Sequence, residues 1–213
     1  KKVKRTKNRP IASGKISVVH GLIYANILCL VALIVLLQFN KLTILLALIS
    51  MPLAFTYPLM KRITYWPQLF LGVTFNYGLI LAWTSINNEI SILPILFYMG
   101  AIFWTLGYDT VYGFQDIKDD EIIGVKSTSI KFKKNPKIFL TFCYLLTFIT
   151  IFTLGIIMEF NLFYYIGLIL IGYLFFNQII IFNKNNAKIC LKIFKSNNLL
   201  GLIIFLNIFI GKL

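Results

Sequence analysis

The chain contains seven long apolar segments, which constrain its fold more than any other feature. A helix needs about 20 residues to cross the ~30 Å hydrocarbon core of a bilayer. The segments lack the period-two alternation of a transmembrane β-barrel. We therefore predict an all-α, polytopic transmembrane helical bundle with spans at residues 17–38, 42–60, 67–86, 91–112, 138–158, 161–182 and 198–213.

The composition excludes several other classes of protein. Hydrophobic residues make up 59% of the 213 residues and charged residues only 13%. In a soluble domain, nearly half of the residues are hydrophobic and about a quarter are charged. The three cysteines are odd in number and far apart, which argues against a disulfide scaffold. The net charge of +14 is typical of nucleic-acid binding, but basic loops also orient membrane proteins. We predict a lipid bilayer as the environment and no nucleic-acid partner.

The distribution of lysine and arginine supports seven alternating spans. Four loops on one side hold 19 of the 21 basic residues: 1–16, 61–66, 113–137 and 183–197. The positive-inside rule places these loops in the cytoplasm. We expect one transmembrane domain over residues 1–213, with no obligate protein partner. Because the chain opens in a basic loop and not at Met, we also expect it to be an N-terminally truncated fragment.

Five of the seven acidic residues fall within thirteen positions at the end of the fourth predicted span. If one helix continues through this stretch, Asp109, Asp116 and Asp120 share a narrow stripe, because residues advance by about 100° each. Asp119 lies about 80° away from that stripe and Glu121 about 120°. The cluster is compatible with a solvated acidic helix end or with a cation site.

Two features favour the cation site. Asp109 lies within an apolar run, where an unpaired charge is costly, and the acids oppose the basic trend of the other loops on this side. Mg²⁺ binds a few carboxylates, keeps some waters and often shares a substrate phosphate. The residues therefore predict a metal–diphosphate site at the cytoplasmic membrane surface.

Three segments resemble motifs of the UbiA-type intramembrane prenyltransferases. Residues 108–120 (YDTVYGFQDIKDD) and 124–128 (GVKST) resemble the family's second aspartate-rich motif. Residues 5–14 (RTKNRPIASG) resemble the stretch after the first motif, N-D-x-x-D-x-x-x-D, and residues 57–62 (YPLMKR) resemble a Tyr-x-x-x-Lys segment. The likeness is greatest to the 4-hydroxybenzoate branch of the family.

The resemblance implies an enzyme that transfers a polyprenyl group from its diphosphate to the carbon ortho to the hydroxyl of 4-hydroxybenzoate, in ubiquinone biosynthesis. It implies Mg²⁺ dependence and a place in a bacterial or mitochondrial inner membrane. Family members have nine helices and a first aspartate-rich motif that this sequence lacks. We therefore expect residues 1–213 alone to be inactive and the full-length parent to be active.

The resemblance also implies roles for individual residues. Metal ligands would be Asp116 and Asp120, with Asp109 and Asp119 as further contacts. Lys61 and Arg62 would hold phosphate oxygens, and the catalytic residues would be Lys61, Tyr57, Asp109, Asp116 and Asp120. Tyr57 and Tyr112 would hydrogen-bond phosphate or stabilise the cation, and the additional substrate contacts would be Asn8, Arg9 and Lys126. The alternative for the basic residues is a topological charge at a span end, and interfacial tyrosines are common in any membrane protein.

Two other functions remain open at this point. The chain could instead belong to another branch of the same family, the prenyltransferases for haem O, chlorophyll or other quinone rings. A cation-coupled transporter could use the acidic stripe to bind an ion. Transporters place such sites near the bilayer midplane and often carry inverted repeats, whereas these carboxylates gather at one predicted surface.

Overall fold

The computed structural model describes residues 8–213, and all regular elements in that part of the chain are helices. Residues 1–7, which include the start of the 5–14 segment, lie outside it. The elements in chain order are α1 (Val18–Leu36), α2 (Lys41–Thr56), η2 (Tyr57–Leu59), α3 (Met60–Ile63), α4 (Pro67–Phe75), α5 (Gly78–Asn87), α6 (Ile92–Gly113), α7 (Ile117–Ile123), α8 (Thr128–Lys131), α9 (Pro136–Ile157), α10 (Leu162–Ile181) and α11 (Ala187–Lys212).

Seven helical stretches are long and apolar enough to cross a membrane, which confirms the predicted all-α polytopic bundle. Two of these spans consist of more than one helix: Lys41–Ile63 contains α2, η2 and α3, and Pro67–Asn87 contains α4 and α5. The 3-10 turn η2 contains Pro58. Proline cannot donate a backbone hydrogen bond, which accounts for the irregular helix there.

For the last span, predicted at 198–213, the predicted first residue is wrong. Helix α11 begins at Ala187, so most of the predicted loop 183–197 is helical. Lys188, Lys192 and Lys195 are exposed along one face of this extension, and Cys190 and Ile193 are buried on another. Spacings of three and four residues put the lysines on one side of a helix. The three lysines lower the mean hydropathy of this segment, although its apolar face packs against the bundle. Low hydropathy therefore made the segment resemble a loop.

The acidic segment is not one continuous helix, which corrects the predicted stripe of three carboxylates. Helix α6 ends at Gly113, and α7 begins at Ile117 with Asp116 at its N-cap position. Phe114 lies in the turn between them and is buried, with its ring centroid 5.3 Å from that of Phe182. Burial of this ring holds the chain in a turn, so Asp116 and Asp120 do not continue the face of α6 that carries Asp109.

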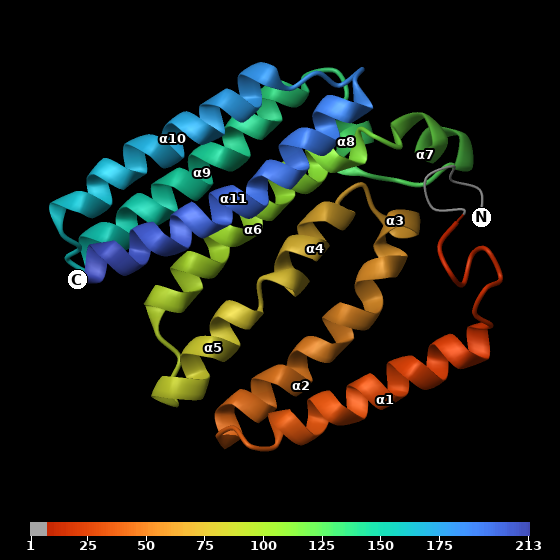
Figure 1. The fold of residues 1–213 in the computed structure, drawn as a ribbon, viewed down its shortest axis with the longest axis horizontal. Coiled ribbons are helices and arrows are strands. Elements are labelled where there is room, and N and C mark those ends of the chain that lie inside the picture. Colours follow the sequence, from red (N-terminus) through yellow and green to blue (C-terminus); the bar gives the residue numbers. More distant parts are fainter. Residues whose placement is uncertain (1–7) are drawn as a thin grey trace.

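The core lies among α6, α9, α10 and α11, which pack side by side (Figure 1). Small residues allow these helices to approach closely. A Cβ atom on Gly107 would lie 2.5 Å from Cε1 of Tyr144, and one on Gly155 would lie 2.3 Å from Cε1 of Tyr164. Both tyrosines are almost fully buried, so the glycines are required for this packing.

A chain of side-chain hydrogen bonds crosses the same four helices. Tyr144 Oη donates to Gln178 Oε1 at 2.9 Å, and Gln178 Nε2 donates to Ser196 Oγ at 3.2 Å. Trp104 Nε1 donates to Asn197 Oδ1 at 2.8 Å. Bonds between membrane helices contribute about 0.6 kcal/mol each on average, so their main effect here is to fix the register of α6 against α11.

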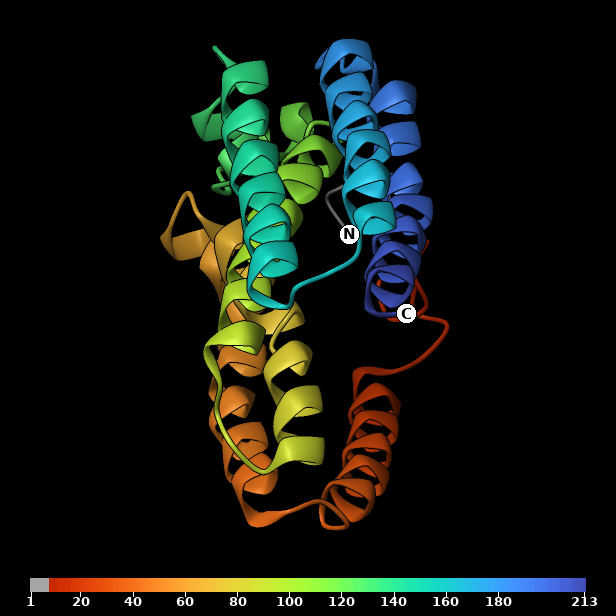
Figure 2. The ribbon, with the colours of Figure 1, turned by 90° about the vertical axis from the view of Figure 1, so that its left-hand side faces the viewer.

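Helices α4 and α5 pack beside α6, α2 packs against α4 and α5, and α1 lies at the outer edge of the array (Figures 1 and 2). No residue of α1 is buried in the described structure. At one end of the bundle α3 meets α4, α6 leads into α7 and α8, and α10 turns into α11. We call this the basic end, because these junctions carry most of the lysines.

Candidate active site

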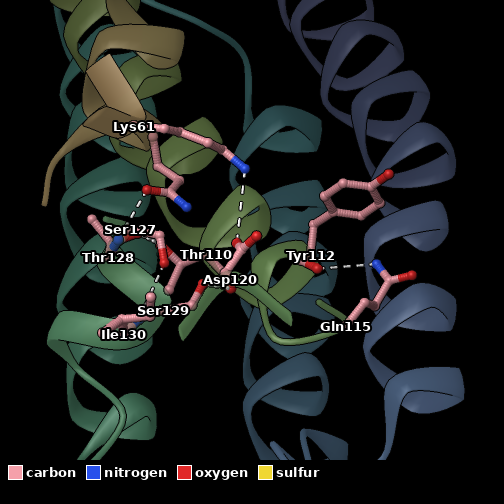
Figure 3. A network of polar contacts seen from close by, with 10 residues as sticks. Lys61, Thr110, Tyr112, Gln115, Asp120, Ser127, Thr128, Ser129 and Ile130 are labelled. Carbon is pink, nitrogen blue, oxygen red and sulfur yellow. Dashed lines mark hydrogen bonds and ion pairs between the residues drawn. The ribbon is translucent and has the colours of Figure 1, made fainter. Parts of the chain in front are cut away.

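The ion pair between Lys61 and Asp120 is the centre of the candidate site, at the basic end of the bundle (Figure 3). Lys61 Nζ lies 3.9 Å from Asp120 Oδ2. The Lys61 side chain is 48% exposed, and that of Asp120 only 8%. A buried carboxylate requires compensation of its charge, and Lys61 provides part of it while its ammonium remains accessible to a ligand.

The position of Asp120 is set by the local structure of α7. Its carbonyl oxygen accepts hydrogen bonds from Gly124 N and Val125 N, both at 3.1 Å. Gly124 closes the helix with φ 78°, a left-handed conformation that glycine adopts without strain. This C-terminal turn returns the chain toward α3 directly after the carboxylate.

Lys126 joins the acidic segment to α3. Its backbone N donates to Lys61 O at 2.7 Å, and its Nζ donates to Ile63 O at 3.0 Å. The same ammonium lies 5.6 Å from the ring centroid of Tyr65. Lys126 was predicted as a substrate contact from the family resemblance. The structure also gives it a positioning role, because its backbone holds the segment next to Lys61.

A buried hydrogen-bond network anchors the next residues to the helices (Figure 3). Thr128 N donates to Gln68 Oε1 at 2.9 Å, and the hydroxyls of Thr128 and Thr110 lie 2.6 Å apart. Ser129 Oγ donates to Thr110 O at 2.7 Å. Sequence reasoning missed Gln68, Thr110 and Ser129. The sequence signal for these residues was an uncharged polar side chain within or beside an apolar span. A polar group that is buried there must form a hydrogen bond.

Asp109 lies near Lys61, and Tyr57 lies near Asp109. Asp109 is half-buried in the last turns of α6 and interacts electrostatically with Lys61. Tyr57, half-buried in η2, is close enough to interact with Asp109 in the same way. The structure therefore brings together four of the predicted residues: Lys61, Tyr57, Asp109 and Asp120.

Asp116 and Asp119 lie at the start of α7, each half-buried. Glu121 is exposed and pairs with Lys133, with 2.6 Å between Lys133 Nζ and Glu121 Oε1. Among residues 8–213, no three His, Cys, Asp or Glu side chains come close enough to hold a metal ion by themselves. Magnesium usually takes one or two carboxylates and completes its shell with water and phosphate oxygens. The buried Asp120 carboxylate is a hard oxygen donor of this type, so the residues fit an ion shared with a phosphate.

Aromatic rings line the face of α6 toward α11. The ring of Tyr112 lies 4.3 Å from that of Phe194, and the ring of Tyr108 lies 5.8 Å from Phe194 and 5.9 Å from Trp104. Tyr112 was predicted, whereas Trp104, Tyr108 and Phe194 were not. Trp104, Tyr108 and Tyr112 are four residues apart along α6, which was a usable signal because such residues share one side of a helix.

The remaining predicted residues lie at the surface. Arg62, in the last turn of α3, is exposed, and so are Asn8 and Arg9 in the turn before α1. Neither arginine forms an ion pair with an acid of the described chain. These three residues are thus not packed into the group formed around Lys61.

Comparison with known proteins adds the family. The UbiA prenyltransferase family model matches residues 1–208. The chain is 40% identical over 213 residues to the mitochondrial 4-hydroxybenzoate polyprenyltransferase of Drosophila pseudoobscura pseudoobscura, covering 100% of this chain and 54% of that protein. It is 37% identical over 211 residues to the 4-hydroxybenzoate octaprenyltransferase of Psychromonas ingrahamii, covering 99% of this chain and 74% of that one. The chain thus spans about half the length of the first of these curated relatives.

The fold is also that of a solved structure. A UbiA homolog from Aeropyrum pernix K1 superimposes with a TM-score of 0.82 at 19% identity, over 99% of this chain and 78% of that one. At this identity the likeness shows the fold alone. The family match covers the membrane spans and the segments that hold Lys61 and Asp120. The chain belongs to the UbiA prenyltransferase family.

Proposed function

We propose that the whole protein transfers a polyprenyl group from polyprenyl diphosphate to the ring carbon ortho to the hydroxyl of 4-hydroxybenzoate, as a step of ubiquinone biosynthesis. Family membership and relatives near 40% identity that carry this name support the proposal. The observation that carries it is the half-exposed side chain of Lys61, whose ammonium lies beside the buried carboxylate of Asp120. That arrangement offers a cation to an anionic leaving group and a carboxylate to a metal.

We further propose that the reaction depends on Mg²⁺, held by Asp116 and Asp120 together with the diphosphate, with Asp109 and Asp119 as additional contacts. When bound, the ion would neutralise charge that develops on the leaving diphosphate. Asp120 would keep its ligand oxygen fixed, because Gly124 N and Val125 N hold the carbonyl of the same residue. Precise placement of such groups is what lowers the reaction barrier.

The basic residues would bind the diphosphate directly. Lys61 donates up to three hydrogen bonds, and its side chain is half exposed, so it can contact phosphate oxygens while it remains near Asp120. Lys126 lies on the adjacent segment, and Arg62 follows Lys61 and could form a bidentate contact. Asn8 and Arg9 would join only if the turn before α1 closes over the substrate.

The rings along α6 would shield the reactive carbon. As the allylic C–O bond breaks, its electron pair leaves with the diphosphate and positive charge develops on the prenyl carbon. The faces of Trp104, Tyr108 and Tyr112 can stabilise such a cation and exclude water from it. Electrons of the acceptor ring then form the new C–C bond, and the ring carbon loses its proton.

The proposed location is a bacterial or mitochondrial inner membrane, with the site on the cytoplasmic or matrix side. The location is supported by the relatives' names and by the seven apolar spans, and the orientation by the loop charge. Lys61 lies at the end of the bundle that carries most of the lysine and arginine residues. A lipid substrate would reach this site without moving its tail out of the bilayer, since each exposed CH₂ costs about 0.8 kcal/mol.

The test is transfer of label from ¹⁴C-4-hydroxybenzoate to a lipid product, with the complete natural protein in membranes, polyprenyl diphosphate and Mg²⁺. Asp120→Asn and Asp116→Asn are expected to lower product formation at least a hundredfold. Glu89→Gln, an exposed acid between α5 and α6, is the matched control and is expected to leave activity unchanged. Full activity in both Asp variants would contradict the proposal.

The acceptor and the extent of the active unit are tested in the same assay. Product from 4-hydroxybenzoate, with none from haem or another quinone precursor, is the expected result. We also propose that residues 1–213 alone give no turnover, because the family's first aspartate-rich motif is absent from them. Normal turnover by those residues would contradict this second statement and leave the first intact.

A further inference from the structure

A cavity of about 610 Å³ lies at the basic end of the bundle, where α9 begins and α10 ends. Lys134, Lys137 and Lys184 line it, and no acidic residue does. The remaining lining residues belong to the start of α9 and the residue before it, the last turn of α10, the link to α11 and the first turn of α11. The cavity is therefore a basic hollow at the level where two membrane spans end.

Two of its lysines are held in place across the junction of the helices. Lys137 Nζ donates to Ile180 O at 3.1 Å, which joins α9 to α10. Lys184 Nζ donates to Lys133 O at 2.9 Å, which joins the α10–α11 link to the segment before α9. Each ammonium has two further N–H groups for a ligand. Lysines that serve only for topology do not require such fixed positions.

A second cavity, of about 370 Å³, adjoins the first and shares Lys134, Lys184 and Asn185 with it. Lys118 and Lys133 line it as well, together with one acid, Glu121. Glu121 is already paired with Lys133 at 2.6 Å. The two hollows thus hold a clear excess of positive charge and could accept two neighbouring anionic groups.

The walls beside the lysines are apolar and face outward. Ile138 is 70% exposed on the first turn of α9, and Ile180 and Ile181 are exposed at the end of α10. At the end of a membrane span, exposed aliphatic side chains contact acyl chains. A ligand for this hollow therefore has phosphate groups at the lysines and hydrocarbon along the isoleucines.

We propose that the two cavities form a binding site for an anionic phospholipid, and that a lipid with two phosphates, diphosphatidylglycerol (cardiolipin), fits it best. Basic hollows between membrane helices are suited to such headgroups. The site uses none of the residues assigned to prenyl transfer, so it stands or falls independently of the proposed function. A bound lipid would connect α9, α10 and the α7 region at the basic end.

The test is a lipid titration of the purified natural protein in detergent, followed by native mass spectrometry. Diphosphatidylglycerol is expected to bind at least tenfold more tightly than phosphatidylcholine, with phosphatidylglycerol between them. Each lysine near a lipid surface contributes about a fivefold gain in affinity. The triple variant Lys134→Gln/Lys137→Gln/Lys184→Gln is therefore expected to bind diphosphatidylglycerol about a hundredfold more weakly.

The matched control is Lys15→Gln/Lys192→Gln/Lys195→Gln, which removes the same charge from exposed positions toward the same end of the bundle. It is expected to stay within about twofold of the natural protein. Because the triple pocket variant also loses two hydrogen bonds to carbonyls, Lys134→Glu is tested separately, with Lys195→Glu as its control. Lys134→Glu keeps both bonds and is expected to weaken binding at least fivefold.

Three outcomes would overturn the proposal. The first is equal affinity for diphosphatidylglycerol and phosphatidylcholine. The second is equal weakening in the pocket variants and their controls. The third is competition by glycerol 3-phosphate at the same concentration as the lipid, because that result would identify a site for a free phosphate and not for a membrane lipid.

Discussion

The buried amide of Gln68 gives the sharpest test of how the site is held together. Its side chain is 3% exposed in the first turn of α4, and its Oε1 accepts the hydrogen bond of Thr128 N at 2.9 Å. Leucine is similar in size but has no acceptor. Thr128 is fully buried, so Gln68→Leu leaves its N–H without that partner and without access to water. Such a group costs about 1–3 kcal/mol.

A cost of about 2 kcal/mol raises the local opening of this segment about thirtyfold, because 1.4 kcal/mol corresponds to a factor of ten. Hydrogen–deuterium exchange of the purified protein in detergent measures this opening. Exchange in peptides from residues 124–132 is expected to accelerate by about that factor. Gln38→Leu is the control, since Gln38 is an exposed glutamine of the α1 end whose Nε2 bonds only weakly, at 3.4 Å, to Ile34 O.

The functional consequence follows from the neighbouring contact. The bond from Lys126 N to Lys61 O holds residues 124–128 beside α3, so a looser segment displaces both lysines. The KM for polyprenyl diphosphate is expected to rise in Gln68→Leu and not in Gln38→Leu. Unchanged exchange in residues 124–132, or the same acceleration spread over α9 and α10, would refute this account.

Three further predictions concern packing, charge and metal. Gly107→Ala is expected to destabilise the protein by about 1–3 kcal/mol in a thermal melt, because its Cβ would meet the ring of Tyr144; Gly78→Ala, with open space around it, is expected to be neutral or stabilising. Lys61→Met is expected to raise the KM for the diphosphate about 10- to 150-fold, the effect of losing about 1.5–3 kcal/mol for a hydrogen bond to a charged group, while Lys41→Met leaves it unchanged. EDTA is expected to abolish transfer and excess Mg²⁺ to restore it; transfer that persists in EDTA would argue against the metal.

The sequence predicted the number of spans and their approximate positions. A helix that crosses the bilayer needs about 20 apolar residues, and such long runs are easily recognised. It failed where charge and packing act together. Lys188, Lys192 and Lys195 made the start of α11 resemble a loop, although the opposite face of the same segment buries Cys190 and Ile193. An amphipathic extension of a span has low mean hydropathy, but its apolar residues recur at helical spacing. Only that spacing predicts that the segment is helical.

The candidate site was predicted in part. Acidic clustering and the Tyr-x-x-x-Lys segment identified Lys61, Tyr57, Asp109 and Asp120, which the structure brings together. The prediction that Asp109, Asp116 and Asp120 share one helical stripe was wrong, because burial of Phe114 turns the chain after Gly113. Contacts between segments distant in sequence were not predictable without the fold. The bond from Thr128 to Gln68 is one of these contacts, since sixty residues separate its partners.

The length of α11 determines the depth of the aromatic face. From Lys195 to Lys212 the helix rises about 26 Å, close to the thickness of the hydrocarbon layer, and both lysines are exposed. Phe194 and the residues before it therefore lie among the lipid headgroups, where Phe194 meets Tyr112. An amphiphile diffusing within one leaflet carries its polar head at the same height. It can thus encounter these rings by lateral movement, with no vertical displacement of its chain.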